Sequence, residues 1–177
     1  MRKIIFLAGC YGVGKSTICD TIIKTLNIPC YSASSLISNI NGETYGKNKY
    51  VNDSDINQEI LIKQIQNIKD EVFIINGHFC LKEKNKNVIT LDADVFNKMD
   101  LSSIILLEAD TSILIDHLLS RDSKIYDFDY LEKLKLCENK QAKIVSNKYD
   151  IPLFIYNMKY TKADIDEIIK IIKQILK

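Results

Sequence analysis

The stretch that decides the fold is Gly9-Cys10-Tyr11-Gly12-Val13-Gly14-Lys15-Ser16, close to the start of the chain. It fits the pattern G-x-x-x-x-G-K-[ST], in which a loop wraps the phosphates of a nucleotide. The apolar run 4–7 before it predicts a buried parallel strand. Behind it, Ile18, Ile22 and Leu26 recur at helical spacing. The loop therefore joins a strand to a helix, as phosphate binding by such a loop requires.

Glycine supplies the backbone freedom that this loop needs, and three of the chain's six glycines lie in it. Glycine adopts positive φ freely and lets the backbone come close to a ligand. With the N-terminus of the following helix, the loop N–H groups form a nest for anionic oxygens. We expect Lys15 to reach the β- and γ-phosphates and the Ser16 hydroxyl to hold Mg²⁺. The expected nucleotide-binding residues are Gly9, Cys10, Tyr11, Gly12, Val13, Gly14, Lys15, Ser16 and Thr17.

The composition is that of an ordinary soluble globular protein. The chain has 177 residues, of which 46% are hydrophobic and 27% charged, and its formal net charge is +1. This length favours a single domain, 1–177, with a sizeable core. The net charge gives no indication of a nucleic-acid or membrane surface, and no apolar run approaches a membrane span. Because a core strand follows Met1 almost at once, we expect no signal peptide and a cytoplasmic location.

Strand-like and helix-like segments alternate along the sequence. Apolar runs predict strands near 3–8, 28–31, 72–75, 104–107 and 152–156. The helical patterns between them have N-terminal cap residues at Ser32, at Asp110 or Thr111, and at Thr161. Strands that alternate with helices predict a parallel sheet covered on both faces. The helices are expected to end near 26, to span about 32–40, 95–99, 111–120 and 129–148, and to begin near 54 and 161.

Three connecting segments stand out by their composition. The stretch 41–52 is polar and contains glycine, which predicts a loop. The segment 79–91 predicts a hairpin that turns at 84–87, and 121–128 predicts a short polar connector. In the helix that begins near 54, Ile56, Ile60, Ile65 and Ile68 are expected to form the apolar face.

Beyond the phosphate loop, two further stretches resemble the adenylate-kinase-like P-loop kinases. The strand end Phe73-Ile74-Ile75-Asn76-Gly77-His78 is similar to the motif where these kinases carry Asp-Gly or Asp-x-His. The strand 104–107, followed by Glu108-Ala109-Asp110 and a helix ending in Ser120-Arg121-Asp122, is similar to the family's strand, helix and arginine-bearing lid. The resemblance covers most of the chain.

The resemblance implies both a fold and an activity. The fold is α/β with three layers, a five-stranded parallel sheet between helices, an acceptor-binding insertion at about 32–70 and a lid at about 121–128. The activity is phosphoryl transfer from Mg-ATP to a small acceptor, most often a nucleoside monophosphate or a nucleoside. The chain departs from the family at Asn76, where an Asp usually orients Mg²⁺ through water. Its two arginines, Arg2 and Arg121, are also fewer than adenylate kinases use.

Arg121 and His78 are the further catalytic candidates. Arg121 stands alone in the interior of a chain that otherwise uses lysine, and its planar guanidinium suits phosphate. It could stabilise charge on the transferring phosphoryl group, or simply complement a helix C-terminus. His78 ends a strand at the edge where α/β sheets bind ligands, so it could contact the acceptor or act as a base. Alternatively, it is a hydrogen-bonded turn histidine. His117, within a helix, is expected to be structural or exposed.

The segment after the second strand offers polar side chains for the acceptor. Asp55 and Asn57 could read hydroxyls or base edges, although an Asp at a helix N-terminus is also favourable for electrostatic reasons alone. The other candidates in this region are Ser32, Ser34, Ser35, Lys47, Lys49, Asp53 and Gln58.

Two other functions compete with a kinase. Asn76 in place of an acid is compatible with a nucleotide sensor that binds ATP and signals with little turnover. Asn147-Lys148-Tyr149-Asp150 matches N-K-x-D, by which GTPases read guanine. This motif follows a helical pattern and no strand, and the chain contains no D-x-x-G, so we interpret the match as chance.

Overall fold

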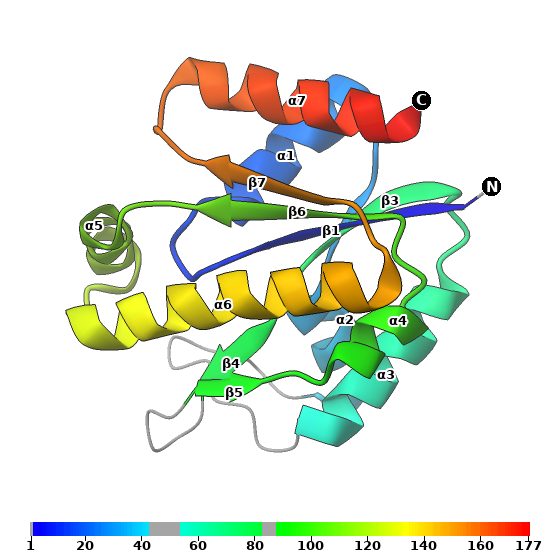
Figure 1. Cartoon of the computed structure of the whole chain (residues 1–177), viewed down its shortest axis with the longest axis horizontal. Helices are drawn as coiled ribbons and strands as arrows, with labels where there is room; N and C mark the ends of the chain where they lie inside the picture. Colours follow the sequence, from blue (N-terminus) through cyan, green and yellow to red (C-terminus); the bar gives the residue numbers. More distant parts are fainter. Residues whose placement is uncertain (1, 43–53, 83–87) are drawn as a thin grey trace.

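The computed structural model, which describes residues 2–42, 54–82 and 88–177, places five strands in one parallel sheet of order β2-β3-β1-β6-β7 (Figure 1). The predicted fold class is thereby confirmed. The central strands are mainly apolar and are buried except at their ends, because helices cover both faces of the sheet. The strands are β1 (Lys3–Gly9), β2 (Cys30–Ser32), β3 (Val72–Asn76), β6 (Ser103–Glu108) and β7 (Leu153–Asn157).

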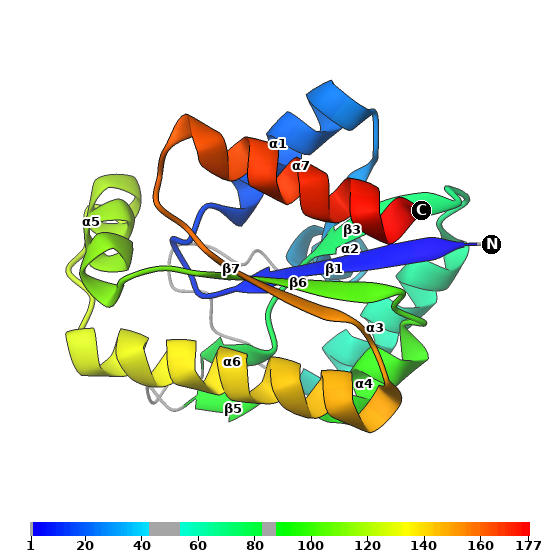
Figure 2. The ribbon, with the colours of Figure 1, turned by 45° about the horizontal axis from the view of Figure 1, so that its top comes forward.

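Helices form a layer on each side of this sheet (Figures 1 and 2). Helices α1 (Lys15–Leu26) and α7 (Lys162–Leu176) pack together over one face. On the other face, α6 (Phe128–Tyr149) runs along the sheet and packs against α4 (Ala93–Lys98). Helix α3 (Ser54–Asn67) contacts α4 and α2 (Ala33–Asn41). Helix α5 (Thr111–Asp122) lies beyond the carboxyl ends of the strands.

A small antiparallel pair, β4 (Cys80–Lys82) and β5 (Val88–Thr90), packs against α6. It confirms the predicted hairpin, whose turn at 84–87 lies outside the described residues. Phe79 before β4 joins Phe6 and Phe96 in an aromatic cluster with ring centroids 4.5–5.3 Å apart. This cluster ties the hairpin and α4 to the central strand. Most of the predicted loop 41–52 also lies outside the described residues, whereas Asn41 ends α2.

Two local predictions were wrong. Helix α5 continues through Arg121 to Asp122, and α6 begins at Phe128, so the connector is only 123–127. Ser123 ends α5 in the left-handed conformation, and the Asp127 side chain caps α6 by accepting a hydrogen bond from Tyr130 N.

The second wrong prediction concerns Ile56, which is 56% exposed. The first turn of α3 buries the polar side chains of Asn57 and Gln58 instead, and Leu61 and Ile65 continue this buried face. Hydrophobic periodicity alone therefore placed the start of the buried face of α3 one position too early.

None of the helices in the described part of the chain has the length and apolar character to cross a membrane.

Candidate active site

The loop between β1 and α1 depends on glycine at three positions. Gly9, Gly12 and Gly14 have φ values of 146°, 81° and 99°. A Cβ at position 9 would lie 2.5 Å from the Leu107 carbonyl oxygen, and one at position 12 would lie 3.0 Å from Leu118 Cγ. At position 14, by contrast, a Cβ would meet no atom within 4 Å. The loop backbone is therefore packed closely on β6 and α5 at its first two glycines and faces open space at the third.

Lys15 and the start of α1 complete this loop. Gly14 is the N-cap of α1, and no side chain within the described residues caps the helix there. The Lys15 ammonium, although largely buried, donates to the carbonyl oxygens of Gly9 at 2.7 Å and Cys10 at 3.2 Å. Ser16 and Thr17 are exposed in the first turn. An uncapped helix N-terminus with a lysine across the loop is a site suited to an anion.

Burial disfavours ionisation of the Cys10 thiol. The side chain is 2% exposed, and burial raises its pKa to about 12. A thiol becomes a nucleophile only as the thiolate. Cys10 therefore contributes its backbone to the loop rather than its sulfur chemistry.

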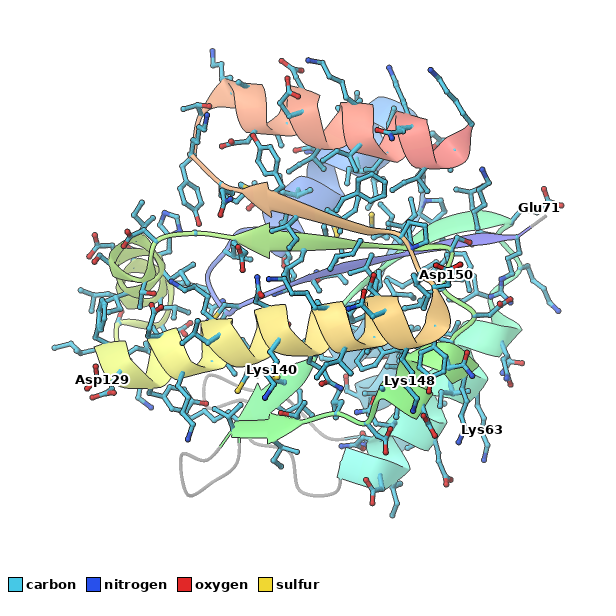
Figure 3. The ribbon with its side chains drawn as sticks, viewed as in Figure 1. Lys63, Glu71, Asp129, Lys140, Lys148 and Asp150 are labelled. Atoms are coloured by element: carbon cyan, nitrogen blue, oxygen red, sulfur yellow. The ribbon has the colours of Figure 1, made fainter. Side chains whose placement is uncertain are left out.

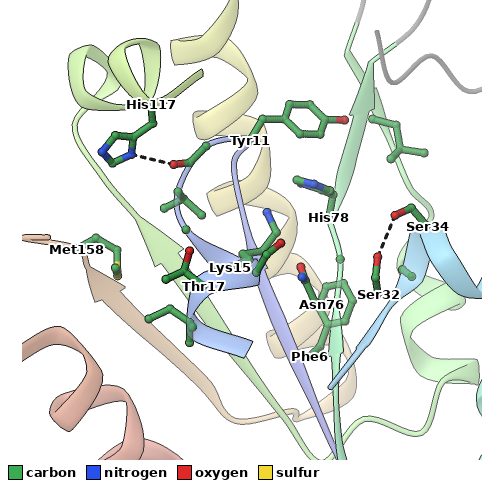
Figure 4. A pocket seen from close by; sticks show the side chains of 18 of the residues that line it. Phe6, Tyr11, Lys15, Thr17, Ser32, Ser34, Asn76, His78, His117 and Met158 are labelled. Atoms are coloured by element: carbon green, nitrogen blue, oxygen red, sulfur yellow. Dashed lines mark hydrogen bonds between the residues drawn. The ribbon is translucent and has the colours of Figure 1, made fainter. Parts of the chain in front are cut away.

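A cavity of about 840 Å³ opens beside the loop (Figure 4). Residues 11–18 line it, together with the end of β3 and parts of α2, α3, α4, α5 and α7. Lys15, Thr17, Asn76 and His78 surround the same space in Figure 4. The cavity thus lies at the carboxyl ends of parallel strands, where α/β sheets bind ligands.

The end of β3 contributes Asn76 and His78 to the cavity wall, as predicted. Between them, Gly77 packs so tightly on Phe6 that a Cβ there would come within 2.8 Å of the ring. The His78 ring lies against Tyr11 of the loop, with centroids 4.3 Å apart. This contact joins the β3 end to the phosphate loop, so the two predicted motifs form one site.

Behind His78 lies Glu138 of α6, a residue that the sequence analysis missed. Its carboxylate accepts hydrogen bonds from Phe79 N at 3.0 Å and Cys80 N at 3.0 Å, and its Oε1 lies 3.4 Å from His78 Nδ1. Burial raises the pKa of Glu138 to about 7, while the charge of Lys15 and these N–H bonds act in the opposite direction.

A signal for Glu138 was present in the sequence. The buried positions of α6 include Leu131, Leu134, Glu138, Gln141 and Val145, spaced by three and four residues. Polar residues on an otherwise apolar helical stripe must find partners in the interior. A search for such exceptions would have found both Glu138 and Gln141.

Arg121 lines the cavity from the last turn of α5. Its guanidinium makes two hydrogen bonds of 2.7 Å to the Asp122 carboxylate, and its side chain is 47% exposed. Asp122 also accepts a hydrogen bond of 2.8 Å from Tyr126 OH. The arginine is therefore held beside the cavity, with part of its surface open to solvent.

His117, for which the sequence predicts a structural or exposed position, is half-buried beside the cavity. It lines the cavity, its Nδ1 lies 3.1 Å from the Gly12 carbonyl oxygen, and its ring meets Tyr160 edge to face at 4.4 Å. Tyr160 OH in turn donates to Val13 O at 3.4 Å. These contacts are compatible with a structural role, and tertiary packing of α5 brings residue 117 to the loop, which spacing within the helix does not reveal.

The part of the cavity walled by α2, α3, α4 and the hairpin is called here the α3 end. Of the polar candidates, Ser32, Ser34, Asn57 and Gln58 line it. Asp55 and Ser35 are not among the described residues of the wall, and Asp55 is exposed. Lys47, Lys49 and Asp53 lie outside the described residues.

The N-K-x-D match lies far from this cavity. Figure 3 shows Lys148 and Asp150 at one end of α6 and Asp129 at the other, next to α5. Asp150 is the C-cap of α6, and Lys148 donates to Asp94 at 2.6 Å. None of the four residues is among the described residues that line the cavity.

Comparisons with known proteins agree with this geometry. The family model described as AAA domain matches residues 8–135. Shikimate kinase from Bacteroides thetaiotaomicron superposes with a TM-score of 0.61, at 17% identity over 98% of this chain and 98% of that chain. Shikimate kinase from Acinetobacter baumannii in complex with shikimate gives 0.67, at 14% identity over 99% and 94%.

A gluconokinase from Sinorhizobium meliloti 1021 gives a TM-score of 0.57, at 12% identity over 98% of both chains. No curated protein matches the chain in sequence. At these identities the structural matches establish the fold, and the family model covers more than half of the chain. The chain therefore belongs to the AAA domain family of P-loop proteins, with the fold of the adenylate-kinase-like P-loop kinases.

Proposed function

We propose that this protein transfers the γ-phosphoryl group of Mg-ATP to a small acceptor, a nucleoside monophosphate or a nucleoside. The observation that carries the proposal is the glycine loop with Lys15 across it at the wall of the 840 Å³ cavity. A cavity of this size lies within the range of about 300–1,000 Å³ that is usual for small-molecule sites. Phosphoryl transfer needs mainly positioning and charge stabilisation, and the residues around this cavity supply both.

Each residue at the loop has a role that follows from its place. The N–H groups of the loop and of the first turn of α1 would hold the phosphates, and Lys15 would exchange its carbonyl partners for phosphate oxygens. Arg121, at the rim, would add positive charge to the transferring group. His117 and Tyr160 would border the nucleotide on the outer side of the loop.

The residues present fit a magnesium ion held partly by substrate. Mg²⁺ prefers hard oxygen ligands and in phosphoryl-transfer sites takes only one or two from the protein. Ser16 offers a hydroxyl in the exposed first turn of α1, and Asn76 offers an amide oxygen at the cavity wall. When bound, the ion would help to neutralise the charge that develops on the phosphate groups.

The α3 end supports a nucleoside-like acceptor. Its polar wall residues Ser32, Ser34, Asn57 and Gln58 are neutral hydrogen-bonding groups, and its remaining wall is largely apolar. Shikimate kinases and a gluconokinase share the fold, so the fold by itself does not choose among acceptors.

Lys15→Ala tests the proposal directly. The variant should lose about 100-fold or more of its ATP-dependent turnover, because one preorganised charge at the phosphates is removed. Its thermal unfolding should remain cooperative. Lys24→Ala, which changes an exposed lysine on the same helix, is the matched control and should keep full activity. Full turnover in Lys15→Ala would refute the role of Lys15.

A nucleotide sensor with weak turnover is the second candidate, and Asn76 at the cavity wall favours it. Asn76→Asp supplies the acid that related kinases carry. A large rise in turnover would mean that Asn76 limits the catalytic rate of the natural protein, as expected for a sensor. Unchanged turnover would favour the kinase.

A further inference from the structure

Two buried amides stand out in the α3 end of the cavity. Asn57 is 3% exposed and Gln58 is 7% exposed, and both line the cavity from the first turns of α3. Asn57 Oδ1 accepts a hydrogen bond of 2.8 Å from Asn41 Nδ2. Asn57 Nδ2 and Gln58 Oε1, however, are shielded from solvent and have no hydrogen-bond partner among the described residues. One donor and one acceptor on adjacent residues are thus unsatisfied.

Buried polar atoms without partners are costly, and sequences retain them mainly where a ligand or a water supplies the partner. The surroundings of these amides are apolar. Ile37, Leu61, Leu81, Leu91 and Phe96 line the same end of the cavity. An apolar wall with a few placed polar groups is the usual composition of a small-molecule site, in which the polar groups fix orientation. Because neither unsatisfied atom has appreciable exposed surface, each amide would have to rotate to present that atom to a ligand.

The charges of the cavity lie elsewhere. Among its described lining residues, the Lys, Arg, Asp and Glu side chains are Lys15, Arg121 and Asp164. These come from the phosphate loop and α1, from α5 and from α7, not from α2, α3, α4 or the hairpin. A carboxylate buried beside Asn57 and Gln58 would meet no cation among the described residues of that wall, and it could offer no donor to Gln58 Oε1.

We propose that Asn57 and Gln58 are specificity residues that bind an uncharged, amide-like edge of the substrate that receives the phosphoryl group. On such an edge, an atom that accepts a hydrogen bond lies beside one that donates a hydrogen bond. A nucleobase and a carboxamide both carry such an edge. This inference rests on the proposed phosphoryl transfer, because it assigns the side chains that hold one end of the phosphoryl acceptor. The other end of that molecule would face Lys15. It also separates this chain from kinases of hydroxy acids, whose acceptors carry a carboxylate.

The experiment measures binding to the full chain saturated with Mg²⁺ and a non-hydrolysable ATP analogue. Calorimetry then compares four probes. Two are the nucleosides uridine and adenosine, the third is a nucleoside analogue that carries a carboxamide in place of the base, and the fourth is gluconate, a hydroxy acid. The variants are Asn57→Leu and Gln58→Met, which keep side-chain volume and remove the unsatisfied atoms. Asn139→Leu is the control, since Asn139 lies on α6 away from the cavity wall and its amide already donates to Glu108 at 2.7 Å.

We expect a nucleoside or the carboxamide compound to bind, and gluconate not to bind. Asn57→Leu and Gln58→Met should weaken that binding about tenfold or more, since a polar pocket group discriminates strongly. Gln58→Met should also raise Tm by about 2 °C or more, because an unsatisfied buried atom is removed. A merely structural role predicts the opposite shift in Tm. Asn139→Leu should lower Tm and leave acceptor binding unchanged.

The outcomes separate this inference from the proposed function. If the wild-type chain fails to bind the ATP analogue, the proposed function fails. If the analogue binds but gluconate is preferred, if no probe binds, or if Gln58→Met binds the nucleoside as tightly as the wild type, the specificity inference is overturned. Preference for the nucleoside over the carboxamide compound identifies the nucleobase as the edge that is read, and the reverse preference identifies the carboxamide.

Discussion

At the scale of single residues, the glycines of the phosphate loop are needed for different reasons. Gly9 has φ of 146°, and a Cβ at this position would clash with a backbone oxygen. Gly14 has φ of 99°, and a Cβ there would point into open space. A backbone atom cannot move aside as a flexible side chain can. The cost of adding one methyl group should therefore differ sharply between the two positions.

Gly9→Ala should be much more destabilising than Gly14→Ala. Positive φ costs a non-glycine residue about 1–2 kcal/mol, and Gly14→Ala should lose about that much. Gly9→Ala adds the clash with Leu107 O and should lose more than about 3 kcal/mol, or fail to fold. Urea unfolding of both variants gives the comparison, and equal losses would contradict the loop geometry described here.

We expect Glu138 to make the stability of the protein depend on pH. Its pKa is raised from an ordinary 4.5 to about 7 in the folded state, chiefly by burial. The folded protein therefore binds this proton more tightly than the unfolded chain does. The resulting stabilisation is complete below pH 4.5 and is lost as the pH rises through 7.

Glu138→Gln should remove this dependence. Between pH 4.5 and 7, the free energy of unfolding of the wild type should fall, relative to the variant, by on the order of 3 kcal/mol. Glu59→Gln, an exposed glutamate on α3, serves as the control and should follow the wild type. Chemical unfolding across this pH range tests the prediction, and parallel curves for wild type and Glu138→Gln would disprove it.

At the scale of elements, the start of α7 is held by a single carboxylate. Asp164 accepts hydrogen bonds from Thr161 N at 2.8 Å, Tyr156 OH at 2.8 Å and Lys159 N at 3.2 Å. Burial acts to raise the pKa of Asp164, but these hydrogen bonds lower it below the ordinary value. Asp164 thereby fixes the turn between β7 and α7, which carries Tyr160 to the phosphate loop.

Asp164→Ala should cost about 3 kcal/mol, because three donors lose a charged acceptor. Asp166→Ala, two positions along on the exposed side of the same helix, should cost less than about 0.5 kcal/mol. Thermal unfolding of the two variants provides the measurement. A similar Tm for both would show that the carboxylate does not anchor the helix.

At the scale of the whole molecule, the strand order brings distant segments to one edge. Strand β1 lies between β3 and β6, so the phosphate loop, Asn76 and His78 emerge side by side although about 60 residues separate them. The N-K-x-D match is at the far end of α6 and cannot reach a base bound at this edge.

Asp150→Ala should therefore leave nucleotide preference unchanged. In a competition assay, ATP and GTP should displace a labelled ATP analogue with the same ratio of affinities in the variant as in the wild type. A base-reading Asp would instead change that ratio by about tenfold or more when removed, because a buried bidentate contact to guanine would be lost. Such a change would revive the GTPase hypothesis.

The sequence predicted the parts of this molecule that local patterns encode. The glycine loop, the alternation of strands and helices, and the caps at Ser32 and Asp110 each depend on neighbours in the chain, and each is confirmed. Glu138 was missed, and the place of His117 beside the loop was not predicted, because both positions depend on tertiary packing. The exposed Ile56 shows a related limit, since the buried face of α3 follows the cavity and includes polar residues there.

The segment from Phe79 to Leu91 is attached to α6 at both of its ends. Glu138 binds the backbone N–H groups of Phe79 and Cys80, and Gln141 donates to Leu91 O at 2.8 Å. One helix therefore holds the described strands of this pair at both of their outer ends. Leu81 and Leu91 line the cavity, so we expect the shape of its wall at these two residues to be set before a ligand binds.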